Sequence, residues 1–67
     1  MRVETLIIGD ELLDGRVTDS NSVRFGTRLN EMGIKVLRRT TIVDDVNTIV
    51  KAAQDVAHRN TDLCIVS

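Results

Sequence analysis

The stretch from Ile7 to Ser22, IIGDELLDGRVTDSNS, decides how this chain folds. It begins as the apolar end of a strand, turns at Gly9 into an acidic pair, and ends in a Ser/Asn/Asp cluster that is typical of a helix start. Gly9 lets the backbone turn and approach a ligand closely, and Gly15 gives the loop a second conformationally permissive position. The stretch therefore predicts a strand, a polar loop and a helix in direct succession.

The residues around this loop alternate between short apolar runs and helical periods. Val3–Ile8 reads as a strand. The residues from 21 to 32 then place Phe25, Leu29 and Met32 on one helical stripe, with good N-cap residues ahead of it (Asp19, Ser20 and Asn21) and a C-terminal stop behind it (Gly33). Gly26 inside this helix costs up to roughly 1 kcal/mol against Ala, and close packing against a sheet is its expected reason.

The second half of the chain repeats this alternation. Ile34–Val43 is rich in β-branched residues and predicts a strand. Asp44 and Asp45 precede a predicted helix that ends near Asn60. Its apolar residues recur at helical spacing and are Val46, Ile49, Val50, Ala53, Val56 and Ala57. Leu63–Ser67 is a continuous apolar strand.

This order predicts an α/β fold, namely the βαβαβ start of a three-layer, doubly wound parallel sheet with helices on both faces. Strands covered on both faces are continuous apolar runs, whereas edge strands carry charge. The first and third strands are the apolar ones, and the second carries Lys35, Arg38 and Arg39. The predicted strand order is therefore 2-1-3.

Composition limits the classes of function. Nine Lys and Arg residues against ten Asp and Glu give a net charge of -1 over 67 residues, which provides no basic surface for nucleic acid or an anionic membrane. The single Cys cannot form an internal disulfide and favours a reducing compartment. The N-terminal apolar run is too short for a signal peptide or a membrane span. A cytoplasmic location is expected.

Ligands of doubly wound sheets bind outside the carboxyl ends of the strands, which is where the loop after Ile8 lies. Asp10 and Glu11 are candidate ligands for a hard cation such as Mg²⁺, which commonly links carboxylates to a substrate's phosphates. Asn21 and Ser22 open a helix whose free N–H groups favour an anion. These features predict a site for a phosphate-bearing small molecule.

Simpler interpretations of the same residues remain open. Asp10 and Glu11 are also compatible with solvated residues at a strand end, and Asp19, Ser20 and Asn21 with a cap worth about 1 kcal/mol. Asp44 and Asp45 favour a cap over a catalytic pair. The remaining candidates are expected to be structural. Cys64 is expected to be an inert core residue and His58 a surface residue. Arg38 and Arg39 are expected to protect an edge strand from pairing with other chains.

Three familiar phosphate-binding patterns do not fit. The first strand is followed by neither G-x-G-x-x-G nor G-K-[ST], so a dinucleotide-binding fingerprint and a P-loop are both absent. A phospho-receiver domain shares the strand order, but its third strand should end in Asp, where this chain has Ser67.

The loop IIGDELLDGRVTDSNS, followed by RLNEMGI and VDD, resembles the molybdopterin-binding-like domain, and most strongly the N-terminal domain of competence/damage-inducible proteins of the CinA type. The matching residues are Gly9, Asp10, Glu11, Leu12, Leu13, Gly15, Asp19, Asn21 and Ser22, and the likeness extends over nearly the whole chain. In that family the third strand leads into a T-G-G-x-G-P-T loop, and Ser67 stands at its first position, where Thr is usual. The resemblance thus implies a ligand site formed by Gly9, Asp10, Glu11, Gly15, Asp19, Asn21, Ser22 and Ser67.

The resemblance also implies a function. Relatives bind molybdopterin during molybdenum cofactor assembly, whereas the CinA-type domain is associated with a metal-dependent ADP-ribose pyrophosphatase, a hydrolase. Longer relatives add a C-terminal nicotinamide-mononucleotide deamidase domain. Residues 1–67 are expected to be the N-terminal part of one such domain, inactive alone. An apolar third strand at a free sheet edge predicts a homo-oligomer or a longer chain. A non-catalytic assembly module is the alternative.

Overall fold

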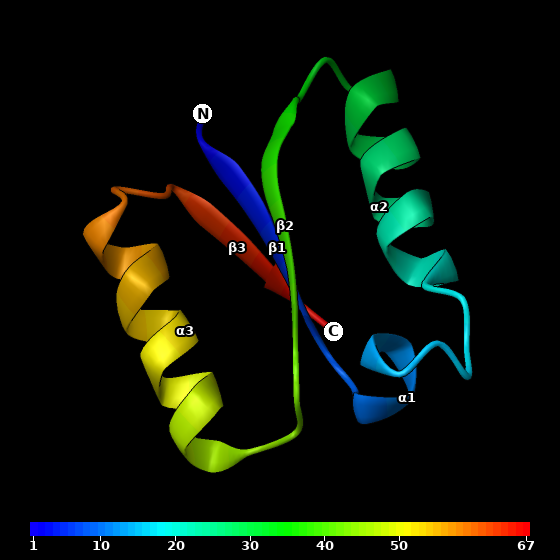
Figure 1. The fold of residues 1–67 in the computed structure, drawn as a ribbon. Helices are drawn as coiled ribbons and strands as arrows, with labels where there is room; N and C mark the ends of the chain where they lie inside the picture. Colours follow the sequence, from blue (N-terminus) through cyan, green and yellow to red (C-terminus); the bar gives the residue numbers. More distant parts are fainter.

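The computed structural model describes all residues from 1 to 67, and Figure 1 shows their arrangement. The elements follow the predicted order, with one addition after the first strand. They are β1 (Val3–Ile8), α1 (Asp10–Leu13), α2 (Ser20–Glu31), β2 (Val36–Ile42), α3 (Val46–His58) and β3 (Leu63–Val66).

The three strands form one parallel sheet in the order β2-β1-β3, which confirms the predicted topology. β1 lies in the centre, and Leu6 is in register with Thr40 of β2 and with Val66 of β3. Both crossovers run through a helix, as parallel neighbours require. One of the two apolar strands, β1, therefore has neighbours on both sides, and the other, β3, forms an edge of the sheet.

The two long helices cover opposite faces of the sheet, so the chain has three layers (Figure 1). The core is small. Val3, Leu6 and Ile7 are the buried apolar residues, and all three belong to β1. Because successive residues of a strand point to opposite faces, β1 supplies buried side chains to both layers.

Helix ends are fixed by the capping residues that the sequence predicts. Asp19 caps α2 by accepting a hydrogen bond from the Ser22 N–H at 3.0 Å, and Asp45 caps α3 by accepting one from the Thr48 N–H at 2.9 Å. At the far end of α2, Gly33 has a φ of +78°, and the Ile34 N–H donates to the Leu29 carbonyl at 2.9 Å. This bond and the left-handed glycine form a Schellman C-cap.

Two features of the α2 side differ from expectation. The loop after β1 contains the short helix α1, although the sequence indicated only a polar loop. Gly26 does not pack closely against the sheet, because a Cβ built at this position meets no atom within 4 Å. Close contact with β1 or β2 therefore does not explain the glycine.

The open space at Gly26 leads to a stability prediction. We expect Gly26→Ala to raise the free energy of unfolding by about 0.5–1 kcal/mol, because Ala has the higher helix propensity and meets no clash. Urea denaturation followed by circular dichroism measures this change. Loss of stability in the variant would show that Gly26 is held by a contact absent from this structure.

None of the helices has both the length and the apolar character that a membrane crossing needs. The free edge of β3 carries apolar side chains, with Leu63 42% and Val66 57% exposed. The free edge of β2 is charged, since Arg38 and Arg39 are exposed there.

Candidate functional site

The carboxyl ends of all three strands meet at the end of β1. The Ile8 N–H donates to the Ser67 carbonyl at 2.9 Å, and the Gly9 N–H donates to the Ile42 carbonyl at 3.0 Å. The turn into the following loop is thereby fixed by both neighbouring strands. This is the edge of the sheet at which a doubly wound fold binds its ligands.

A groove of about 270 Å³ lies at this edge, on the α2 side of the sheet, and we call it the carboxyl-edge groove. Its apolar walls come from β1, α1 and the loop before α2. Its polar lining is Glu11, Thr18, Asp19, Ser20, Asn21 and Ser67, without any Lys or Arg. The structure thus brings together four of the predicted site residues, namely Glu11, Asp19, Asn21 and Ser67.

Asp19 is the best-defined anionic group in the groove. The Ser22 side chain, followed by the Ser22 N–H, lowers the pKa of the Asp19 carboxyl below its ordinary value. The N–H contact, at 3.0 Å, is the one with hydrogen-bond geometry, since the buried Ser22 hydroxyl has no partner. Asp19 is therefore ionised near neutral pH while one of its oxygens caps the helix.

The two acids of the predicted pair, Asp10 and Glu11, have different surroundings. Glu11 lines the carboxyl-edge groove, and a Cβ at Gly9 would lie 3.0 Å from its Oε1, so the glycine leaves room for this carboxylate. Asp10 instead accepts a hydrogen bond from the Asp44 N–H at 3.1 Å, which ties α1 to the loop after β2. Asp10 does not line the groove.

The other predicted residues lie beside the groove rather than in its lining. Gly15 has a φ of +83°, in the left-handed region that favours glycine, and it follows Asp14, whose carboxylate pairs with Arg16 at 2.7 Å. Ser22 is buried in the first turns of α2. These residues shape the loop and the helix start that carry the lining.

The groove offers oxygen donors that suit a hard cation, but only in part. No group of three or more His, Cys, Asp or Glu side chains gathers as a complete metal site. Glu11 and Asp19 share the groove with hydroxyl and amide groups, and Mg²⁺ is commonly held by one or two carboxylates, substrate phosphates and water. This donor set fits a cation that is shared with a phosphate ligand.

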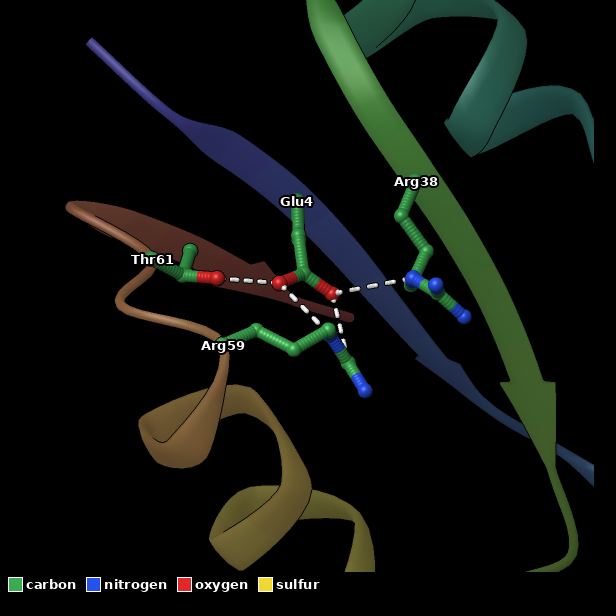
Figure 2. Close-up of polar contacts among 4 residues, drawn as sticks. All are labelled: Glu4, Arg38, Arg59 and Thr61. Atoms are coloured by element: carbon green, nitrogen blue, oxygen red, sulfur yellow. Dashed lines mark hydrogen bonds and ion pairs between the residues drawn. The ribbon is translucent and has the colours of Figure 1, made fainter.

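Sequence reasoning missed a buried ion pair at the opposite end of β1. Glu4 is only 4% exposed and faces α3 (Figure 2). Its carboxylate accepts hydrogen bonds from the Arg59 guanidinium at 2.7 and 3.1 Å and from the Thr61 hydroxyl, and Arg38 lies 3.9 Å away. The Arg59 contact is the main cause that lowers the pKa of Glu4.

This ion pair is structural rather than part of the carboxyl-edge groove. It joins the start of β1 to the residues that follow α3, and none of its members lines the groove. The available signal was a single charged residue, Glu4, inside the predicted central strand. Its main partner, Arg59, lies 55 positions away, so spacing could not have identified it.

The residues that were expected to be structural behave largely in that way. His58 is exposed at the end of α3. Cys64 is half-buried rather than part of the core, because β3 is a sheet edge, and burial raises the pKa of its thiol. A protonated thiol is a weak nucleophile, so the structure gives Cys64 no reactive character.

Comparison with known proteins identifies the family. The model of a family described as "Probable molybdopterin binding domain" matches residues 4–67. A CinA-like protein of Amoebophilus asiaticus is 36% identical over 67 residues, and protein PH0439 of Pyrococcus horikoshii is 42% identical over 64 residues. These alignments cover 100% and 96% of this chain but only 16% and 25% of the two relatives.

A solved structure agrees with these matches. The protein CinA of Thermoplasma acidophilum, titled as a protein of unknown function, superposes with a TM-score of 0.87 at 29% identity. The superposition covers 98% of this chain and 40% of that one. The chain therefore belongs to the molybdopterin-binding domain family and is CinA-like.

Proposed function

We propose that the carboxyl-edge groove binds a phosphate-bearing nucleotide or pterin together with a divalent cation. The observation that carries this proposal is the convergence of Glu11, Asp19, Asn21 and Ser67, from three separate segments, on one groove. The lining has carboxylates but no Lys or Arg, so no cationic side chain would balance the charge of a bare phosphate. A shared cation such as Mg²⁺ would neutralise that charge.

The residues of the groove have distinct roles in this proposal. Glu11 and Asp19 contribute carboxylate oxygens toward the cation, and Asn21 contributes an amide near the start of α2, where free N–H groups favour an anion. Ser67 offers a hydroxyl at the end of the sheet next to β1. Asp10 acts indirectly, because it positions α1 through the Asp44 N–H.

The resemblance to CinA-type proteins makes ADP-ribose the preferred ligand, with molybdopterin as the alternative. In a longer protein, hydrolysis would add water across the pyrophosphate, break one P–O bond and release AMP and ribose 5-phosphate. The 67-residue chain spans only a minor part of its relatives and is expected to bind without turnover. A non-catalytic assembly role would be favoured if no phosphate ligand binds.

Titration of the 67-residue chain with ADP-ribose, followed by amide NMR shifts, tests the proposal. With Mg²⁺ present we expect shifts at Glu11, Asn21 and Ser67, and with EDTA we expect them to disappear. Adenosine, which lacks phosphate, is the ligand control, and a phosphorylated pterin separates the two ligand classes. Equal shifts with adenosine, or none with either phosphate ligand, would contradict the proposal.

A matched pair of variants locates the effect. Asp19→Asn keeps a good N-cap but removes the charge, and we expect about tenfold weaker Mg²⁺-dependent binding. Asp45→Asn makes the same change at the cap of α3, outside the groove, and should leave the affinity unchanged. Equal losses in the two variants would show that the negative charge acts at long range rather than in the groove.

A further inference from the structure

A second and larger groove lies on the other side of the sheet, between α3 and the face formed by β1 and β2. This α3 groove measures about 480 Å³, within the range typical of small-molecule sites. Its apolar lining is Leu6, Ile42, Ala52 and Val56. It shares no lining residue with the carboxyl-edge groove, so it is independent of the function proposed above.

The charges along the α3 groove almost balance, and their pairing shows where one positive charge remains. Glu4 is satisfied by the Arg59 guanidinium and the Thr61 hydroxyl. Asp55 lies 3.8 Å from Lys51, one turn earlier on α3. Three cationic and two anionic side chains line the groove. Glu4 is shared by Arg59 at 2.7 Å and by Arg38 at 3.9 Å, so one positive charge remains on the Arg38 side.

Arg38 is placed to meet a ligand. Its Nε lies 3.9 Å from Glu4, longer than the Arg59 contacts, and its side chain is 56% exposed. Figure 2 shows the rest of its guanidinium directed away from the Glu4 carboxylate. A planar guanidinium with free N–H groups is well suited to bind a carboxylate through two hydrogen bonds.

We propose that the α3 groove binds an amphipathic monoanion, with its apolar body on Ile42, Ala52 and Val56 and its carboxylate on Arg38. The apolar lining accounts for the body of the ligand, and the one unmatched positive charge accounts for its single negative charge. A neutral apolar ligand would leave Arg38 unused, and a multiply charged one would meet Glu4 and Asp55.

Titration with decanoate below its micelle concentration, followed by amide NMR shifts, tests this proposal. We expect shifts at Thr40, Ile42 and Ala52 that saturate at one ligand per chain, and about tenfold weaker binding of neutral decanol. Shifts confined to the exposed β3 residues Leu63 and Val66, or equal affinities for decanoate and decanol, would overturn the proposal.

Arg38 and Arg39 provide a matched pair of variants, because they are adjacent on β2 and point to opposite faces of the sheet. Arg38→Gln should weaken decanoate binding about tenfold, whereas Arg39→Gln should not change it. Equal effects of the two variants would contradict the role of Arg38. If Arg38→Gln lowers the stability, the salt dependence of decanoate binding to the unaltered chain tests the proposal instead. Binding through Arg38 must weaken as the salt concentration rises.

Discussion

Leu6→Ala is expected to lower the free energy of unfolding by about 2–5 kcal/mol. Leu6 is 3% exposed, lies at the centre of the central strand and is flanked by Thr40 and Val66 in the neighbouring strands. It is one of only three buried apolar residues, so no second core layer can compensate for the cavity. A chain of this length has about 3–10 kcal/mol of total stability, so the loss is a large fraction of the total.

Leu37→Ala is the matched control for this experiment. Leu37 undergoes the same truncation on β2 but is 50% exposed, so we expect a loss below about 1 kcal/mol. Urea denaturation of both variants, followed by circular dichroism, measures the difference. Equal losses would show that the core is not concentrated on β1.

The strand order could be predicted from sequence because it depends on composition. The apolar runs Val3–Ile8 and Leu63–Val66 contrast with the charged run that contains Arg38 and Arg39. This contrast places the charged strand at an edge, and the observed order β2-β1-β3 agrees with it. The helix ends could be predicted equally well, since Asp19, Asp45 and Gly33 act through local backbone geometry.

The short helix α1 and the role of Asp10 could not be predicted in this way. Four helical residues are fewer than a stable helix needs in isolation, so Asp10–Leu13 depends on its tertiary surroundings. The carboxylate of Asp10 is directed by the N–H of Asp44, 34 positions away. Sequence therefore indicated the acidic loop, whereas the division of its two acids between the groove and the β2–α3 loop is a tertiary effect.

The candidate groove illustrates the same limit. Topology places the end of β1 beside the end of β3, and this is why Ser67 could be grouped with Glu11 and Asn21 from sequence. Which side chains point into the groove depends on local rotation. Ser22 is one position after Asn21, yet its side chain is buried and does not line the groove.

Glu4→Gln is expected to destabilise the chain by about 2–3 kcal/mol at neutral pH. The substitution keeps the volume but removes the charge that accepts two hydrogen bonds from Arg59, and its NH₂ group cannot accept from Arg59 or Thr61. The full cost of breaking a buried pair is reduced, because the Arg59 side chain is 30% exposed and can recover some hydration. Glu31→Gln, the same change at an exposed position, should have little effect.

The effect of Glu4→Gln should depend on pH in a defined direction. Arg59 lowers the pKa of Glu4 in the folded state, so the contribution of Glu4 is present above the pKa in the unfolded chain, about 4.3, and is lost as pH falls through the folded value. The pKa values of Asp19 and Asp45 are also lowered. Their contributions to stability therefore also decline as pH falls, in the unaltered chain and in the Glu4→Gln variant alike. Denaturation from neutral pH into this acidic range should thus show the unaltered chain losing stability faster than the variant, so that the two curves approach each other. A constant difference between them would mean that the carboxylate charge of Glu4 does not hold Arg59 in place.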